Sequence, residues 1–196
     1  MTKFASRGMP FAVVALLFTF VTGCTLKVTI NDRLSFATEQ KIVQHYSKAP
    51  AILFVIDDAT KGYELESYPS GFVGAAASKQ FPIGWTLTAY LEQAGTAAFQ
   101  RPGVTPTQIG VHLSSANISY TNSGFITGID WVDLTLTLQT TIPREHQTRA
   151  INVRRTVDVP VSQTALQNSK YDVMAEVMEL LVVDYIDEIV RLLANQ

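Results

Sequence analysis

The strongest constraint on the fold is a strict two-residue alternation of apolar and polar side chains around position 135. The apolar members are Val132, Leu134, Leu136 and Leu138. Successive side chains of a β-strand point to opposite faces, so the pattern predicts a strand with one buried face and one face exposed to solvent. The same period continues over 151–159, after a turn at 143–147. The two segments therefore predict a long antiparallel pair with one face that must be covered.

Three further segments have the character of strands. The apolar alternation over 109–120 changes phase near Ser114-Ser115, which predicts a β-bulge there. Residues 51–56 form a continuous apolar run that ends at two aspartates, as in a buried strand followed by a turn. A short strand is also compatible with 26–30. Glycines and prolines over 61–82 predict a long loop.

Two helices are expected to cover the sheet. Apolar residues recur at spacings of three and four over 84–99, and a broader apolar band runs along 170–193. With the strands, these helices predict an α+β fold. We expect a two-layer sandwich in which two helices lie on one face of a mostly antiparallel sheet of about four strands.

The N-terminus has the parts of a secretory signal peptide. Lys3 and Arg7 precede an apolar run over 11–21, which is shorter than the roughly 20 apolar residues that span a bilayer. The only cysteine of the chain, Cys24, follows this run. We expect a signal peptide over 1–23, a lipidated N-terminus and tether over 24–50, and a single α+β domain over 51–196.

The four residues Val21-Thr22-Gly23-Cys24 resemble a bacterial lipobox. The resemblance implies cleavage after Gly23 and modification of Cys24 by acyl chains such as palmitate. Thr25, where an aspartate would favour retention in the inner membrane, implies the outer membrane, with the domain facing the periplasm. Two other interpretations of Cys24 stay open: an inert thiol in an N-terminal anchor helix, or a residue lost with a cleaved signal.

Several features beyond the lipobox resemble the YajG-type group of uncharacterised lipoproteins. They are the strand 51–56 ending in Asp57-Asp58-Ala59, the sequence Lys61-Gly62-Tyr63, the helix near 84–99, and a long strand pair before a terminal helix. The resemblance implies a small lipoprotein of the Gram-negative envelope. The lipoproteins of LPS assembly and of polysaccharide or curli export share a similar two-layer plan, at the level of fold only.

Composition excludes several classes of protein. A single cysteine leaves no structural disulfide within the chain and no zinc-type Cys/His spacing. The 15 basic and 17 acidic side chains form no basic cluster, so we expect no nucleic-acid partner. We also expect no cofactor and no metal.

We expect no enzymatic activity, because the sequence has no nucleophile–base motif. His45, His112 and His146 lack partners at ligand-like spacing. Asp57 and Asp58 could act as paired catalytic carboxylates. Acids at the end of a strand are more typical of turns, in which they bind local backbone amides.

Five side chains are candidates for a binding surface: Tyr63, Tyr68, Phe72, Phe125 and Arg155. The aromatic residues suit a contact with a partner, or they fold back and cap the sheet. Arg155 falls on the apolar phase of its strand. It either keeps its head in water at the edge of the sheet or anchors a carboxylate or a lipid phosphate.

Taken together, the sequence predicts a membrane-anchored, non-enzymatic lipoprotein. Acyl chains would bind the membrane, and the domain would act as a binding or assembly accessory for another envelope protein. The alternative is an auxiliary lipoprotein of an export system that cradles a lipid or glycan between helices and sheet.

Overall fold

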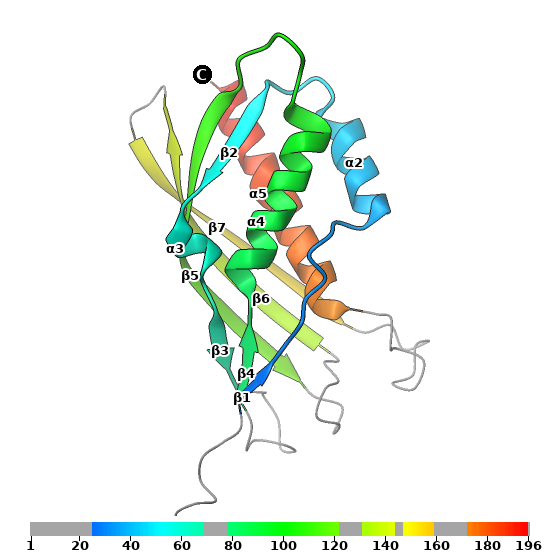
Figure 1. Ribbon diagram of the computed structural model, residues 1–196, viewed down its shortest axis with the longest axis vertical. Helices are drawn as coiled ribbons and strands as arrows, with labels where there is room; N and C mark the ends of the chain where they lie inside the picture. The colour runs from blue at the N-terminus through cyan, green and yellow to red at the C-terminus, as the bar shows by residue number, and fades with distance from the viewer. Residues whose placement is uncertain (1–24, 69–77, 122–130, 144–146, 159–171, 196) are drawn as a thin grey trace, which may run out of the picture.

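The computed structural model describes residues 25–68, 78–121, 131–143, 147–158 and 172–195. These residues form two β-sheets, four α-helices and a short π-helix (Figure 1). None of the described helices combines the length and the apolar character that crossing a bilayer requires.

The larger sheet has four strands in the order β2-β5-β6-β7. The strands are β2 (Ile52–Ile56), β5 (Thr107–Thr121), β6 (Trp131–Ile142) and β7 (Gln147–Asp158). Strands β5, β6 and β7 pair antiparallel, as their alternation predicts, and the register shifts between Leu113 and Ser115. The predicted bulge is therefore confirmed. Strand β2 pairs parallel to β5, so the sheet is mixed.

A second, smaller sheet lies at one end of the molecule. Its order is β1 (Thr25–Lys27), β4 (Ser78–Phe81) and β3 (Leu65–Ser67). Strand β1 runs parallel to β4, and β3 runs antiparallel to it. Part of the region predicted as one long loop, 61–82, thus folds as β3 and β4. These strands are only three or four residues long, too short for alternation to reveal them.

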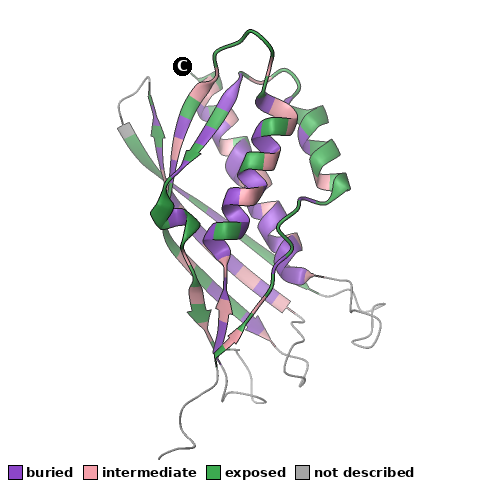
Figure 2. Ribbon diagram, viewed as in Figure 1, coloured by how far each residue is buried: buried purple, intermediate pink, exposed green. Residues whose placement is uncertain are grey.

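The two predicted helices are confirmed as α4 (Ile83–Ala94) and α5 (Val173–Ala194). The π-helix η1 (Gly95–Phe99) extends α4 directly. Helix α5 packs on β6 and β7, and α4 packs beside α5 and against β2 (Figure 1). Figure 2 shows that the buried residues gather where helices and sheet meet. The largest of the fully buried side chains include Tyr90, Tyr120 and Tyr185.

Helix α3 (Asp58–Lys61) joins β2 to the smaller sheet and approaches the start of α4 very closely. Gly84 N donates to Tyr63 O at 2.9 Å. A β-carbon at Gly84 would lie 1.7 Å from the carbonyl oxygen of Thr60. Only glycine therefore allows these two backbones to meet as they do.

The expectation that 24–50 forms a tether is corrected over its described part, 25–50. Besides β1, this segment contains α2 (Phe36–Tyr46), which begins at the N-cap Ser35. Ile42 and Tyr46, four residues apart, are buried, and Tyr46 OH donates to Asp187 Oδ1 at 2.7 Å. Two apolar residues four positions apart and an N-cap thus accompany the packing of this mostly polar segment on η1 and α4, with a hydrogen bond to α5.

The α+β class is confirmed, and its detailed form differs from the expectation. The described chain has two mixed sheets of three and four strands where one mostly antiparallel sheet was expected. It has four α-helices where two were expected. Parallel pairing joins segments that are distant in the sequence, and no local pattern encodes it.

Candidate functional site

The strap, residues 28–35, connects β1 to α2 and runs over α4 (Figure 1). Val28 N donates to Gln80 O at 2.9 Å, which continues the pairing of β1 with β4. Tyr90 OH donates to Asn31 O at 2.7 Å. Burial first, and then nearby carboxylates including Glu179, raise the pKa of Tyr90, so its hydroxyl remains a proton donor.

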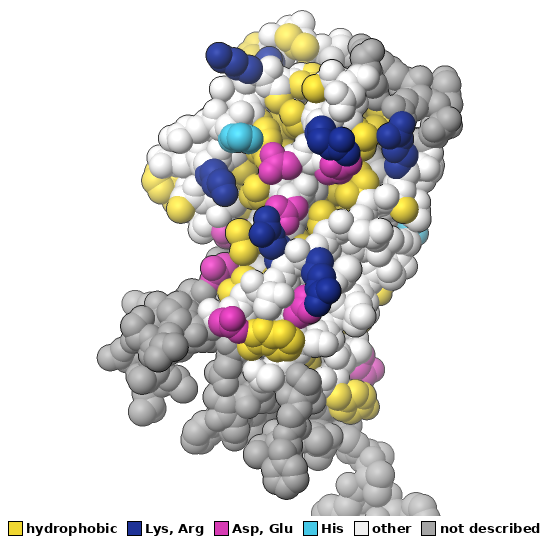
Figure 3. Space-filling view, turned by 180° about the vertical axis from the view of Figure 1, so that it is seen from behind, with side chains coloured by type: hydrophobic (Ala, Val, Ile, Leu, Met, Phe, Trp, Pro, Cys, Tyr) yellow, Lys and Arg dark blue, Asp and Glu magenta, His cyan; other side chains and the backbone are white. Residues whose placement is uncertain are grey.

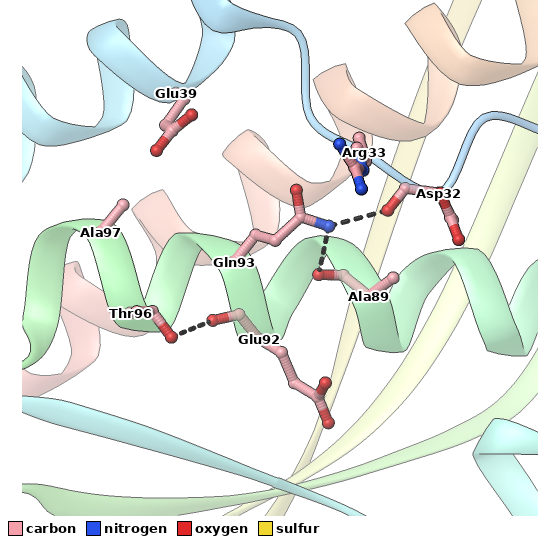
Figure 4. Close-up of a pocket in the computed structure, with 8 residues that line it drawn as sticks. All are labelled: Asp32, Arg33, Glu39, Ala89, Glu92, Gln93, Thr96 and Ala97. Carbon is pink, nitrogen blue, oxygen red and sulfur yellow. Dashed lines mark hydrogen bonds between the residues drawn. The ribbon is translucent and has the colours of Figure 1, made fainter.

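Gln93 of α4 holds the middle of the strap with both ends of its amide. Its Oε1 accepts from Leu34 N at 3.1 Å, and its Nε2 donates to Asp32 O at 2.7 Å. The Nε2 also donates to Ala89 O at 3.0 Å, within α4 itself (Figure 4). The strap therefore has a defined path across α4.

Glu179 of α5 fixes the point where the strap becomes α2. Its side chain is only 8% exposed. Its Oε1 accepts from Ser35 N at 2.5 Å, and its Oε2 accepts from the hydroxyls of Ser35 at 2.7 Å and Thr38 at 2.5 Å. This carboxylate lies at the N-terminus of α2, where the helix dipole favours negative charge. Glu179 thus latches α2 to α5.

Open grooves lie beside the strap. One has a volume of about 590 Å3, and Figure 4 shows the side chains that line it between the strap, α2 and α4. Its charged residues are Asp32, Arg33, Glu39 and Glu92. A second groove of about 500 Å3 is lined by Lys27, Pro82 and the exposed Trp85, among others. Both grooves are open at the surface and present charged or aromatic side chains to a binding partner.

The residues predicted for lipid attachment, Gly23 and Cys24, lie outside the described residues. So do Phe72 and Phe125 of the predicted binding surface. Of the two remaining tyrosines, Tyr63 is half-buried and its hydroxyl accepts from Ala116 N at 3.1 Å. Tyr68 is 64% exposed, directly after β3. Tyr63 thus packs into the fold, whereas Tyr68 is open to contact.

Arg155 lies opposite Leu134 of β6, on the face that carries the core. Its guanidinium donates two hydrogen bonds to Asp184 of α5, at 2.5 and 2.6 Å. These hydrogen bonds raise the pKa of Arg155. The arginine head is therefore engaged by a carboxylate of its own chain and joins the edge strand to the terminal helix.

Figure 3 shows a face on which basic side chains lie close to acidic ones. Among the described residues, Arg154 pairs with Asp133 and Arg191 pairs with Glu188, both at 2.5 Å. The positive charge of each of these arginines is compensated by its carboxylate partner, which disfavours the pairs as sites for phosphate groups.

Two described histidines have carboxylate partners that are distant in sequence. His112 Nδ1 lies 2.6 Å from Asp57 Oδ2, and His45 Nε2 lies 3.6 Å from Asp187 Oδ1. His146 lies outside the described residues. Within the described part of the chain, His, Cys, Asp and Glu side chains form no group of three that could hold a metal ion.

Asp57 behaves as the turn residue that its position after β2 predicts. It is the N-cap of α3, and its Oδ1 accepts from Thr60 N at 2.7 Å. Burial acts to raise the pKa of Asp57, but hydrogen bonds from Thr60 and the contact with His112 outweigh it and lower the pKa. The contact with His112 was not predicted, because 55 residues separate the partners.

Replacing Asp57 with asparagine keeps a capping side chain and removes the charge. We expect Asp57→Asn to lower the free energy of unfolding at neutral pH by up to about 1 kcal/mol, because solvent screens a half-exposed pair. The folded-state pKa of Asp57 lies below the unfolded value. The stabilisation is therefore full above pH about 4 and disappears as the pH falls through the folded-state pKa. Urea unfolding of the unchanged protein and of the variant, at pH values above and below about 4, measures the difference in unfolding free energy. A difference that grows toward acid pH contradicts the prediction.

Comparisons with known proteins assign no family. No protein-family model matches the chain, and no curated protein matches it. Three solved structures are similar in part. A DUF330-family protein from Xanthomonas campestris is 14% identical, with a TM-score of 0.34, over 85% of this chain and 91% of that one. A minor lipoprotein from Acinetobacter baumannii is 12% identical, with a TM-score of 0.30, over 74% and 89%.

The third structure, described as an uncharacterized protein, is 13% identical, with a TM-score of 0.33, over 88% of this chain and 99% of that one. Identities and TM-scores this low carry no conclusion about function. None of the three names supports the YajG-type resemblance in particular.

Proposed function

We propose that this chain is a lipid-anchored, non-enzymatic lipoprotein of the Gram-negative envelope that acts as a binding or assembly accessory. The lipobox-like sequence Val21-Thr22-Gly23-Cys24 carries the proposal. The fold supports it, because the residue after Cys24 already belongs to β1. Acyl chains on Cys24 would then hold a folded body at the membrane surface, most simply that of the outer membrane facing the periplasm.

A role in binding fits the chemistry of the described surface. The carboxylates with lowered pKa serve as a helix cap or as partners of arginine, which are structural tasks. Two large aromatic side chains next to the strap are exposed: Phe36, the first residue of α2, is 73% exposed, and Trp85, in the second groove, is 59% exposed. Aromatic residues of this kind are enriched in the cores of protein interfaces.

The alternative is a carrier that cradles a lipid or glycan between helices and sheet. The packing favours the accessory role, because that space is filled by fully buried side chains such as Leu134, Tyr185 and Ile186. The one feature in favour of a ligand is the groove of about 500 Å3 beside Trp85, a volume in the range of small-molecule sites.

Cys24→Ser tests the anchor. In a Gram-negative host, the unchanged chain is expected to incorporate labelled palmitate and to fractionate with the outer membrane. Cys24→Ser is expected to lose both the palmitate label and the association with the outer membrane. Membrane-bound protein is expected to fall at least roughly tenfold, since each buried methylene of an acyl chain contributes about 0.8 kcal/mol to membrane binding. Thr25→Ser keeps Cys24 and a hydroxyl at the next position, and serves as the matched control.

Two results would count against this function. A Cys24→Ser protein that still fractionates with membranes would refute the lipid anchor. Native mass spectrometry of the acylated protein, extracted without denaturation, is expected to give the mass of the chain with its acyl groups alone. An additional bound lipid or glycan mass would favour the carrier over the accessory.

A further inference from the structure

The end of the domain that carries β1 has no slack between it and the residue predicted to be acylated. Thr25 pairs with Ser78 in the β1–β4 ladder, and their hydroxyls lie 2.9 Å apart. Thr25 Oγ1 also donates to Glu66 Oε1 of β3 at 3.2 Å. Consecutive Cα atoms are only about 3.8 Å apart. An acyl group on Cys24 would therefore enter the bilayer within one residue of the sheet.

The same N-terminal segment is held along its whole length. Asn31 N donates to Asp172 Oδ2 at 3.0 Å, and Ser35 is bound by Glu179. Strand β4 therefore holds β1, and helices α4 and α5 hold the strap. The anchor is connected to the rigid domain and lacks the flexible linker that would let the domain move away from the membrane.

Several chain segments meet at this end (Figure 1). Tyr68 follows β3, next to Ser67, which pairs with Lys79 of β4. The end of β5 joins them, because Tyr120 OH donates to Ser67 O at 3.2 Å. Trp131 opens β6 and pairs with the last residue of β5. We call this surface, formed by β1, β3, β4, Tyr68 and Trp131, the anchor pole.

The side chains of the anchor pole suit a lipid headgroup layer. Tyr68 is exposed and Trp131 is half-buried. Both residue types have an apolar ring with a polar group and are enriched where membrane meets water.

We propose that the anchor pole sits directly on the bilayer surface, so that the domain stands on the membrane in one orientation. The inference rests on the proposed lipid anchor and adds the docking surface and its partner, a lipid bilayer. Loop residues around Val104, between η1 and β5, lie at the opposite end of the molecule (Figure 1) and face away from the membrane.

The two tryptophans of the chain provide an internal ruler. Trp131 belongs to the anchor pole. Trp85 follows β4 in the chain and lies in the first turn of α4. Strand β4 begins at Ser78, so its length places Trp85 roughly 10 Å or more from that residue. Trp85→Phe leaves Trp131 as the only reporter, and Trp131→Phe leaves Trp85.

The experiment uses the full acylated chain in phosphatidylcholine–phosphatidylglycerol vesicles that contain a headgroup spin-labelled lipid. Quenching of Trp131 is expected to be at least about twofold stronger than quenching of Trp85, because the proposed orientation puts Trp131 at the headgroup layer and Trp85 beyond it. Inserting about eight Gly/Ser residues between Cys24 and Thr25 gives the anchor slack. This insertion is expected to reduce Trp131 quenching to the level of Trp85 while vesicle flotation is retained.

A second pair of variants avoids the tryptophans. Tyr68→Cys and Val104→Cys place one dye at each end of the acylated chain, whose own cysteine is blocked by the lipid. Both positions are exposed. The spin-labelled lipid is expected to quench the dye at position 68 and to leave the dye at 104 nearly unaffected. Equal quenching at both ends in floated protein would refute the seated orientation alone. A chain that does not float with vesicles would refute the lipid anchor as well.

Discussion

Gly84→Ala is expected to lower the free energy of unfolding by about 3 kcal/mol or more, because the added methyl group would overlap a backbone oxygen. The β-carbon would lie 1.7 Å from Thr60 O and 2.9 Å from Tyr63 Cβ. Neither neighbour is a flexible chain end, so α3 and α4 would have to separate. Urea unfolding of the purified protein, followed by circular dichroism, measures the loss.

Gly95→Ala is the matched control for Gly84→Ala. Gly95 has helical backbone angles, and the closest atom to an added β-carbon is Phe54 Cδ2 at 3.6 Å, an ordinary contact. Alanine is favoured over glycine in a helix by roughly 0.5–1 kcal/mol, so the control is expected to be neutral or stabilising. Equal losses of unfolding free energy in the two variants would show that the close approach of the two backbones at Gly84 does not cause the destabilisation.

Glu179→Ala is expected to cost about 3 kcal/mol and to release α2 from the body. The change removes the acceptor for a backbone N–H and two hydroxyls in a largely buried site, and each unsatisfied group carries a desolvation penalty. Hydrogen exchange is expected to show lost protection over α2, including Ile42, while β6 remains protected. An α2 that stays protected in this variant would contradict the latch.

Glu176 provides the control for this variant, since it lies one turn earlier on α5. Burial first, and then the charge of Glu179, raise the pKa of Glu176. Glu176→Gln removes a carboxylate that its surroundings disfavour, so it is expected to leave stability unchanged or to increase it slightly. A similar loss in both variants would indicate a general effect of charge on α5.

Elements with a regular internal pattern could be predicted from the sequence. Strands β5 to β7 and helices α4 and α5 each bury one face over many residues, so the period of their apolar residues identifies them. The bulge near Ser114 was visible for the same reason, as a change of phase. Asp57 could be assigned to a turn, because a carboxylate that follows a strand commonly binds nearby amides.

Elements that depend on distant partners could not be predicted. Helix α2 has two buried residues, and its start is fixed by Glu179, 144 positions along the chain from Ser35. A local signal was present, since serine is a preferred N-cap residue and Ser35 accepts from Thr38 N. The partner of Arg155 was also beyond reach, because nothing in the local pattern of β7 identifies Asp184. The contacts of the anchor pole depend likewise on short strands that pair only in the folded protein.

The long-range latch has a consequence for how the chain reaches its final form. The hydrogen bonds of Asn31 and Ser35 need Asp172 and Glu179, which lie 141 and 144 residues later in the chain. In a polypeptide that emerges N-terminus first, these two contacts of the earliest segment are therefore among the last that can form. Closing such distant contacts is slow. A protein exported in this direction would therefore complete the attachment of its leading segment only after release of the C-terminal helix.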